Sequence, residues 1–330
     1  MAITLNANKF IGTLANLIAY SRVLDTYKIG EAINEPLDKF RGADIANGDS
    51  TLILTAGIPS VYDVDFDNST LLTVVKPTVK EQVISVSAWK AIQLSINRYL
   101  LAGAFINESA MATLTAYLLF TMQVAKKLHM YDTIEELVHK RMGAEITANN
   151  HIVTINGVAV DPNDDVQTQL ATRTNNATLF FKWLKKELRQ YELGKKKGYK
   201  DATDTTGMKV VESKDNMCLI LSPELMASLD VDALAVLLKS DELTKRANID
   251  FIEMDMTAGG AGSGYDNISS AYAVLCSYEA FVYGYFYQVA TSFFDASILN
   301  TNNWLHFSYY KGNVEYAPLE VLKLDNYTFD

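Results

Sequence analysis

Three aspartates alternate along the segment DVDFD, where Asp63, Asp65 and Asp67 occupy every second position. This spacing matches the first three ligands of a helix–loop–helix calcium site. Such a site also needs a glycine at its sixth position and a glutamate at its twelfth, where this chain has Asn68 and Val74. We therefore interpret the three aspartates as one solvated face of a β-strand, with weak cation binding as a minor alternative.

Glu136 and His139 have the Glu-x-x-His spacing found on the helices of carboxylate di-iron proteins. That centre needs a second Glu-x-x-His motif and two further glutamates, and the chain has no second motif. We interpret His139 as an exposed helical histidine beside Glu135 and Glu136. An enzyme whose site forms only between subunits stays as a remote alternative, with these three residues as its candidates.

Other catalytic and cofactor motifs are incomplete. The run GAGSG at residues 260–264 lacks the third glycine of a dinucleotide-binding turn and is predicted to be a loop. The chain contains no Gly-Lys-Ser/Thr phosphate loop, and Ser263 lacks the glycines of a nucleophile elbow. The four histidines form no metal-binding pair at i, i+4. We therefore predict no catalytic, cofactor or metal site, and no cofactor.

Positive charge is concentrated in one region. A helix predicted at residues 176–193, terminated by Gly194, combines apolar residues with a cationic face, and a basic loop at residues 195–207 follows it. A solvated helix face and an interface role are both open interpretations. The basic residues of the region are Lys182, Lys185, Lys186, Arg189, Lys195, Lys196, Lys197 and Lys200.

The composition limits the function classes. The chain has 330 residues, of which 49% are hydrophobic and 21% charged, as is typical of a globular protein with a large core. The net charge is −10. Phosphate contacts need clustered cations, so this charge argues against tight, non-specific wrapping of nucleic acid, but not against passive enclosure.

Cys218 and Cys276 are too few for a disulfide framework, and both lie in apolar runs, which predicts reduced core residues. The N-terminus lacks the features of a signal peptide. The longest weakly charged stretch, residues 280–294, is shorter than the ~20 residues that a membrane helix needs. We therefore expect a soluble protein, made inside the cell, with no membrane contact.

A long β-hairpin is predicted at residues 51–86, with arms at 51–66 and 71–86 joined by the turn residues 67–70. This register places Phe66 opposite Leu71 and Asp63 opposite Val74, so Lys76 lies diagonal to Asp63. Each arm of about 15 residues would span roughly 50 Å. A two-stranded ribbon of that length cannot bury itself, so we expect it to lie on a neighbouring subunit.

The remaining elements mix helices and strands without βαβ regularity, which predicts the α+β class. Residues 217–221 (MCLIL) are expected to form a strand, with Pro223 in the first turn of a helix. Strands are also expected at residues 248–256 and through most of the chain from residue 265 to residue 324. Helices are expected at residues 8–24, 108–128, 132–143, 231–238 and 242–247, and a strand–turn–strand at 144–160.

This order of elements resembles the Hong Kong 97-type major capsid proteins of tailed double-stranded DNA bacteriophages. The stretch MCLILSPELMASL resembles the family's strand and Pro step before a helix, and WLHFSYYKGNVEYAPLEVLKL resembles its closing strands. The resemblance implies an N-terminal arm, an extended hairpin loop, a spine helix with a peripheral domain, an axial domain and a closing strand. These would be residues 1–49, 50–86, 87–204, 205–310 and 311–330, the last including the C-terminal tail.

The function that the resemblance implies is a major capsid protein. Its copies would assemble as hexamers and pentamers into an icosahedral shell around phage DNA, with portal and scaffolding or decoration proteins as partners. The shell would touch DNA weakly and be built in the bacterial cytoplasm as part of the virion. A nanocompartment shell of the encapsulin type is the alternative on the same fold.

The predicted intersubunit contact joins the acidic hairpin face of one copy to the basic region of another. The alternative is a solvated hairpin face whose only effect is to discourage aggregation through the exposed strand edge. The residues of the hypothesised contact are Asp63, Asp65, Asp67, Lys76, Lys185, Lys186, Arg189, Lys195, Lys196 and Lys197.

Overall fold

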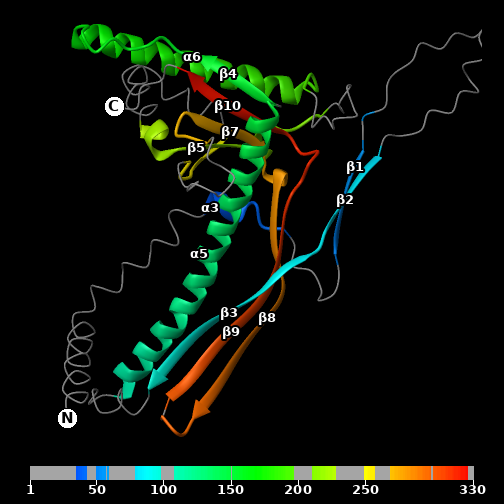
Figure 1. Cartoon of the computed structure of the whole chain (residues 1–330), viewed down its shortest axis with the longest axis vertical. Coiled ribbons are helices and arrows are strands. Elements are labelled where there is room, and N and C mark those ends of the chain that lie inside the picture. Colours follow the sequence, from blue (N-terminus) through cyan, green and yellow to red (C-terminus); the bar gives the residue numbers. More distant parts are fainter. Residues whose placement is uncertain are drawn as a thin grey trace, which may run out of the picture. The chain divides into compact units, whose positions relative to one another are not determined.

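The computed structural model divides into two compact units (Figure 1). The first unit contains Met1–Ser50, Ser85–Ile134 and Tyr283–Lys311, and the second contains Thr51–Ile84, Glu135–Val282 and Gly312–Asp330. This division does not test the five predicted domain boundaries, which remain predictions. The residues that the structure describes are 35–42, 50–56, 58, 79–97, 108–149, 151–196, 210–227, 249–256, 268–298 and 300–325.

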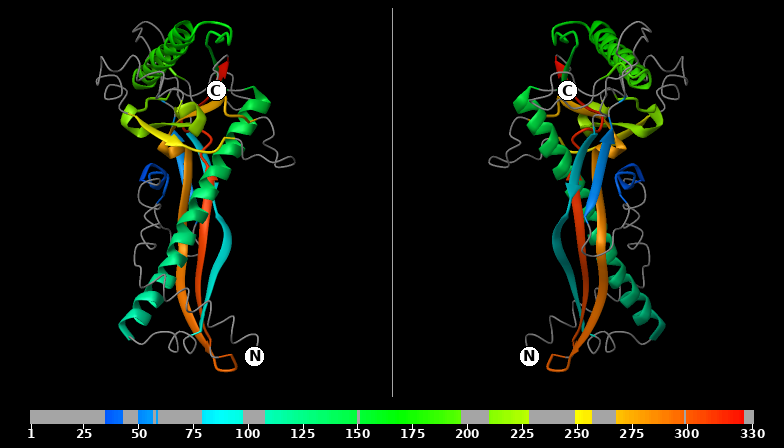
Figure 2. Two further views of the ribbon diagram at one scale, coloured as in Figure 1. Left: turned by 90° about the vertical axis from the view of Figure 1, so that its left-hand side faces the viewer. Right: turned by 90° about the vertical axis from the view of Figure 1, so that its right-hand side faces the viewer.

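A three-stranded sheet forms the centre of the first unit, in the order β3-β9-β8. Strands β3 (Val86–Asn97) and β9 (Asn300–Asn313) run antiparallel, and β8 (Phe281–Asp295) lies beside β9. Helix α5 (Glu108–Ala148) is long, and its part within the first unit, up to Ile134, follows one face of this sheet (Figure 2). The His129 ring there meets the rings of Phe307 and Tyr309 edge-on, at centroid distances of 5.6 and 5.0 Å.

Helix α5 is continuous, so the prediction of two helices with a restart at residue 132 is wrong. Thr133, at the predicted start of the second helix, lies inside α5, where its hydroxyl donates a hydrogen bond to the His129 carbonyl at 2.7 Å. Buried Met130, Ile134 and Val138 follow one another at intervals of four. This apolar stripe crosses the position of the predicted break and favours an unbroken helix.

Residues 144–148 complete the last turns of α5, so the strand–turn–strand predicted at 144–160 is wrong in its first half. The chain reverses through Asn149 and His151, both at positive φ, and β4 (Ile152–Asn156) follows. The sequence AEITA is helical because it continues a helix whose buried face is already formed.

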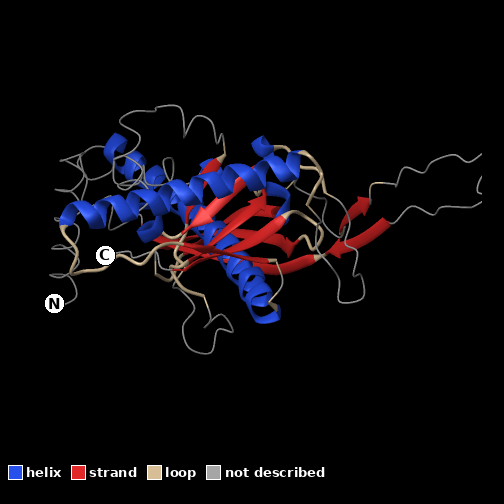
Figure 3. Ribbon diagram, turned by 90° about the horizontal axis from the view of Figure 1, so that it is seen from above, coloured by secondary structure: helices blue, strands red, loops and turns tan. Residues whose placement is uncertain are grey.

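The second unit is built on a mixed five-stranded sheet in the order β4-β10-β7-β5-β6. β10 is parallel to β4 and β5 is parallel to β6, whereas β7 is antiparallel to both β10 and β5. Helix α6 lies across this sheet (Figure 3). Its buried Phe180, Leu184 and Leu188 pack with sheet residues in one apolar cluster. The bounds are β5 Met217–Leu221, β6 Asp250–Glu253, β7 Tyr272–Ser277, β10 Leu319–Asp325 and α6 Val166–Glu192.

Helix α6 begins ten residues before the predicted start at residue 176. Asp165 caps it, because its side chain accepts a hydrogen bond from the Thr168 backbone N–H at 2.6 Å. The first turns of α6 are polar, so the sequence shows no helical spacing of apolar residues there. The predicted end is confirmed, since Gly194 follows the helix at a φ of 61°.

Other predicted elements are confirmed. Strands β5 and β6, the helical residues 223–227 after β5, and the strand-rich end of the chain are as expected. Both cysteines lie fully in the core. Short helices among the described residues include α3 (Glu35–Asp38), η3 (Lys214–Asn216) and η4 (Tyr278–Ala280).

The base of the predicted hairpin is present as β1 (Thr51–Ala56) and β2 (Val79–Ile84), paired antiparallel. Thr51 faces Ile84, whereas unbroken continuation of the predicted register would place it opposite Val86. Val86 instead begins β3 and pairs with Tyr310. The hairpin beyond residue 58, the helices predicted at 8–24, 231–238 and 242–247, and the loop at 260–264 lie outside the described residues.

Candidate intersubunit surface

The β1–β2 ribbon has one exposed apolar face. Leu52 pairs with Val83, Leu54 with Glu81 and Ala56 with Val79, and paired residues project from the same face of a ribbon. Leu54 and Val83 are both 61% exposed. The apolar members of this ribbon face are Leu52, Leu54, Ala56, Val79 and Val83.

The opposite face of the ribbon is anchored in its own chain. Ile84 is only 5% exposed, and a Cβ added at Gly312 would lie 2.5 Å from its Cδ1. The glycine therefore permits a close approach between the end of β2 and the chain that leaves β9. Near the other end of β2, the Lys80 ammonium lies 5.9 Å from the centroid of the Tyr316 ring.

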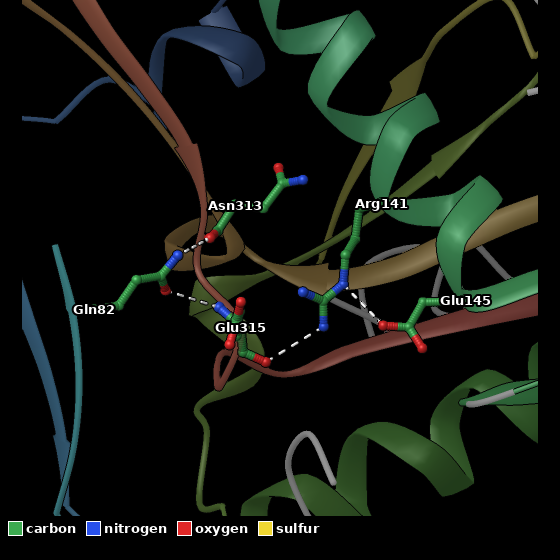
Figure 4. Close-up of polar contacts among 5 residues, drawn as sticks. All are labelled: Gln82, Arg141, Glu145, Asn313 and Glu315. Atoms are coloured by element: carbon green, nitrogen blue, oxygen red, sulfur yellow. Dashed lines mark hydrogen bonds and ion pairs between the residues drawn. The ribbon is translucent and has the colours of Figure 1, made fainter. Parts of the chain in front are cut away.

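Gln82 fastens the ribbon by a pair of hydrogen bonds to the end of β9 and the turn that follows it (Figure 4). Its Nε2 donates to the Asn313 carbonyl at 2.6 Å, and its Oε1 accepts from the Glu315 backbone N–H at 3.1 Å. The Gln82 side-chain amide thus pairs with one backbone acceptor and one backbone donor, in the way that the backbone of a neighbouring strand does. The residues are 231 and 233 positions apart, so no local pattern in the sequence could have revealed them.

Arg141 of α5 holds the same turn from another direction. Its Nη2 donates to the Glu315 carbonyl at 3.3 Å, and its Nε lies 2.9 Å from Glu145 Oε1 one helical turn later (Figure 4). Burial raises the pKa of the Glu145 carboxyl, although the ion pair with Arg141 opposes the shift. Residues 313–315 therefore receive side chains from both β2 and α5, and the direction of the ribbon base is fixed.

The exposed cationic face of α6 is confirmed as a feature of the helix. Lys182, Lys185, Lys186 and Arg189 are exposed, and the opposite side of the helix is buried in the core. Lys195, just after the helix, is also exposed. These residues belong to the second unit, as does the β1–β2 ribbon.

Lys196 differs from its basic neighbours because it belongs to an internal ion cluster. Its ammonium contacts Glu187 of α6, and Nζ lies 2.6 Å from Glu320 Oε1 of β10. Burial lowers the pKa of Lys196, but its hydrogen bonds to the two carboxylates outweigh burial and raise it. Burial also raises the pKa of Glu320. Lys196 therefore joins α6 to the sheet of its own chain.

The structure contradicts the interpretation of His139 as an exposed histidine. Its side chain is 5% exposed, and Nε2 lies 2.7 Å from the Asp255 carbonyl oxygen, to which it donates. Burial lowers the pKa of the imidazole. Glu136 is exposed whereas His139 is buried, so the structure gives His139 a role in packing.

The acidic half of the hypothesised contact, namely Asp63, Asp65, Asp67 and Lys76, lies outside the described residues, as does Lys197. Within the described ranges, no group of three or more His, Cys, Asp or Glu side chains is placed to hold a metal ion. No helix in that part of the chain is both long and apolar enough to cross a membrane.

The fold is similar to that of solved bacteriophage capsids. The capsid structure of Staphylococcus phage Andhra aligns with a TM-score of 0.56 and 9% identity, covering 86% of this chain and 82% of that one. The cyanophage P-SCSP1u capsid gives 0.52 and 12%, covering 86% of each chain. The mature capsid of bacteriophage PhiM1 gives 0.51 and 12%, covering 88% and 87%. At these identities the likeness concerns the fold, which is the α+β capsid fold of the Hong Kong 97 type.

A family model identifies the family to which this chain belongs. The model for the Phi29-like phage major capsid protein matches residues 3–322, and the chain belongs to this family. No curated protein matches the chain. The family is a structural one, and its members are shell components of virions. Neither the family model nor the capsids named above supports the encapsulin alternative.

Proposed function

We propose that copies of this chain assemble as hexamers and pentamers into a closed icosahedral shell around phage double-stranded DNA, and that the chain has no enzymatic activity. The observation that carries the proposal is the ribbon of β1 and β2. It is anchored on one face by Gln82 and Ile84, and it exposes aliphatic side chains on the other. The family of major capsid proteins supports the same function.

The exposed ribbon face is suited to a neighbouring copy. Covering apolar surface stabilises a contact by about 25 cal/mol per Å² removed from water. A shell repeats the same contact in every subunit, so a small gain per copy is sufficient. The ribbon base is already oriented by its own chain, and its loss of conformational entropy on assembly is therefore small.

An electrostatic contact accompanies the apolar one. The acidic hairpin residues Asp63, Asp65 and Asp67, with Lys76 beside them, would face the basic region around α6 on a neighbouring copy. Lys196 is withdrawn from this contact because Glu187 and Glu320 engage it internally. Each exposed pair contributes about 0–1 kcal/mol, again repeated over every subunit. The basic partners are Lys185, Lys186, Arg189, Lys195 and Lys197.

Contact with DNA is weak and non-specific, because a net charge of −10 leaves the chain without a dominant cationic surface. The shell is assembled in the host cytoplasm and carries portal and scaffolding or decoration proteins. Duplex DNA added to the free subunit at physiological salt should show no tight binding by fluorescence anisotropy. Tight binding would contradict this part of the proposal.

The first test uses electron microscopy of the expressed protein. The wild-type chain should form closed shells of uniform size, and Leu54→Lys with Val83→Lys should prevent closure while leaving the subunit folded. Val158→Lys is the matched control, since Val158 is 52% exposed outside the ribbon. A wild-type chain that remains monomeric under all assembly conditions would overturn the proposal.

The second test reverses charges. Changing Asp63, Asp65 and Asp67 to lysine should prevent assembly, and changing Lys185, Lys186 and Arg189 to glutamate in the same chain should restore it. Lys196 must be left intact, because its reversal would place three acidic groups together in the core. Reversal of Lys140, which is exposed in the second unit, is the control. Normal assembly of the aspartate variant at low and high salt would establish a merely solvated face.

A further inference from the structure

The two cysteines of the chain face each other across neighbouring strands of the second unit. Cys218 of β5 is paired with Cys276 of β7 in the antiparallel ladder. The two Sγ atoms are 3.5 Å apart, and both residues have no exposed surface. Together they are all the cysteines of the sequence, although they are 58 positions apart in it.

The backbone geometry permits a bond between them. Directly opposed residues of an antiparallel pair have Cα atoms about 4.5 or about 5.5 Å apart, according to whether they exchange hydrogen bonds. Disulfides span Cα separations of about 4.4–6.8 Å, so either kind of pair lies within the permitted range. The sulfur atoms therefore start 3.5 Å apart and approach bonding distance by rotation of the two side chains, with a small adjustment of the strands.

We propose that Cys218 and Cys276 form an oxidation site that closes to an intrachain disulfide and locks β5 to β7. The oxidant is a small-molecule disulfide such as oxidised glutathione. One thiolate attacks it and forms a mixed disulfide, releasing the first glutathione thiol. The second thiolate then attacks the protein sulfur and releases the second thiol. The protein loses two protons and two electrons, and the oxidant is reduced to two thiols.

Burial controls when this reaction occurs. Thiol exchange needs a thiolate that the reagent can reach, and neither sulfur is reachable while β5 and β7 are closed. Oxidation therefore requires transient opening of these strands, and the finished bond is shielded from reductants in the same way. The pair stays reduced in a reducing cytoplasm and closes slowly in an oxidising medium.

The consequence for a shell, which rests on the proposed function, is a subunit that becomes harder to unfold after release from the host. A bond between residues 58 positions apart closes a long loop and constrains the unfolded chain strongly. The oxidised subunit should therefore show an unfolding midpoint roughly 5–10 °C above that of the reduced one. The bond itself requires no assembly.

The test uses the dispersed, full-length subunit with oxidised glutathione, in low urea to favour opening of the strands. The expected product is a monomer about 2 Da lighter, with peptides containing Cys218 and Cys276 linked, and with the raised midpoint. Its formation should accelerate with urea, and dithiothreitol should reverse it only on unfolding. Because the assay scores mass and melting in the subunit, failure to form shells would leave its result unaffected.

Cys218→Ala and Cys276→Ala are matched controls, since each keeps one thiol and cannot close the bond. Each should give at most a single glutathione adduct and no rise in midpoint. If these variants fail to fold, the comparison of reduced and oxidised wild-type chain still decides. A wild-type chain that yields only glutathione adducts or intermolecular dimers, or an oxidised chain that melts below the reduced one, would overturn the proposal.

Discussion

Gly312 and Ile84 approach each other so closely that a methyl group on the glycine would lie 2.5 Å from the isoleucine Cδ1. Ile84 ends β2, and Gly312 belongs to the last residues of β9. The contact seats the end of the ribbon on the chain that leads to the Gln82 hydrogen bonds. The fit at this point therefore helps to set the direction of the ribbon base within the second unit.

The first prediction tests this fit with Gly312→Ala. Overpacking at a buried contact should lower the free energy of unfolding by about 1–3 kcal/mol. Ile84→Val removes the Cδ1 atom and should cost about 0.5–1.5 kcal/mol alone, yet restore part of the loss in the double variant. Urea unfolding of the four chains measures this coupling. Strictly additive losses would show that the two residues do not compete for the same space.

The second prediction concerns Gln82→Glu. The carboxylate cannot donate to the Asn313 carbonyl, so an acceptor is left facing an acceptor at the present distance of 2.6 Å. The loss should be about 1–3 kcal/mol, localised to the ribbon base. Hydrogen exchange at the amides of β1, β2 and Glu315 should become faster. Gln93→Glu is the control, because Gln93 is an exposed residue of β3. Unchanged hydrogen exchange in the ribbon of the Gln82→Glu variant would contradict the anchoring role of Gln82.

The sequence predicts those parts of the fold whose signal is local. Strand β5 is a continuous apolar run, α6 ends at a glycine, and the ribbon base alternates, so these are recovered. The restart predicted at residue 132 fails because Thr133 satisfies its hydroxyl within the helix. The prediction misses the first turns of α6 because they carry no apolar stripe, and only the capping residue Asp165 marks where the helix begins.

The candidate surface is predicted only in part for the same physical reason. A cationic helix face depends on the 3.6-residue period and can be found from the sequence. The distinction between exposed Lys195 and engaged Lys196 depends on Glu320, which lies 124 positions from Lys196 and arrives through the sheet. The partners of Gln82 are equally distant in sequence. Contacts of this kind follow from topology, which no spacing encodes.

The third prediction is that Lys196→Met is strongly destabilising. It leaves Glu187 and Glu320 side by side in the core with no counter-charge, at a cost of about 3–5 kcal/mol near neutral pH. Burial already raises the pKa of Glu320, and loss of the ammonium raises it further. A raised folded pKa favours the protonated form in the folded state, so the defect should shrink as the pH falls toward about 5. Thermal melting of the variant across that range measures it.

Lys195→Met is the matched control for the third prediction, since Lys195 is exposed and adjacent to Lys196. It should melt within a few tenths of a kcal/mol of wild type at every pH. Equal melting of the two variants would show that the internal cluster contributes nothing to folding.

The fourth prediction concerns the pH dependence at His139. Burial holds its folded pKa below the ordinary value of about 6.5, so below that pH the unfolded chain binds the proton more readily. The stability from neutral His139 is therefore present above pH ~6.5 and is lost as the pH falls. His139→Gln keeps a donor for the Asp255 carbonyl and cannot be protonated. Its unfolding free energy should fall less steeply between about pH 6.5 and 5, measured by urea titration; identical slopes would assign the acid sensitivity elsewhere.

The fifth prediction separates folding from assembly by shortening the hairpin. Replacing residues 58–77 with Asn-Gly should close β1 and β2 with a tight turn in their present register, because residue 57 then faces residue 78 and Asn-Gly favours the turn geometry of two-residue hairpins. The ribbon base retains Gln82 and Ile84, so the subunit should melt cooperatively within a few degrees of wild type. Shells should not form, since the shortened ribbon lacks the length that would reach a neighbour. Calorimetry and electron microscopy on the same preparation read the two outcomes. Lost cooperative melting would show that the hairpin supports its own subunit, and closed shells would show that assembly relies on other surfaces.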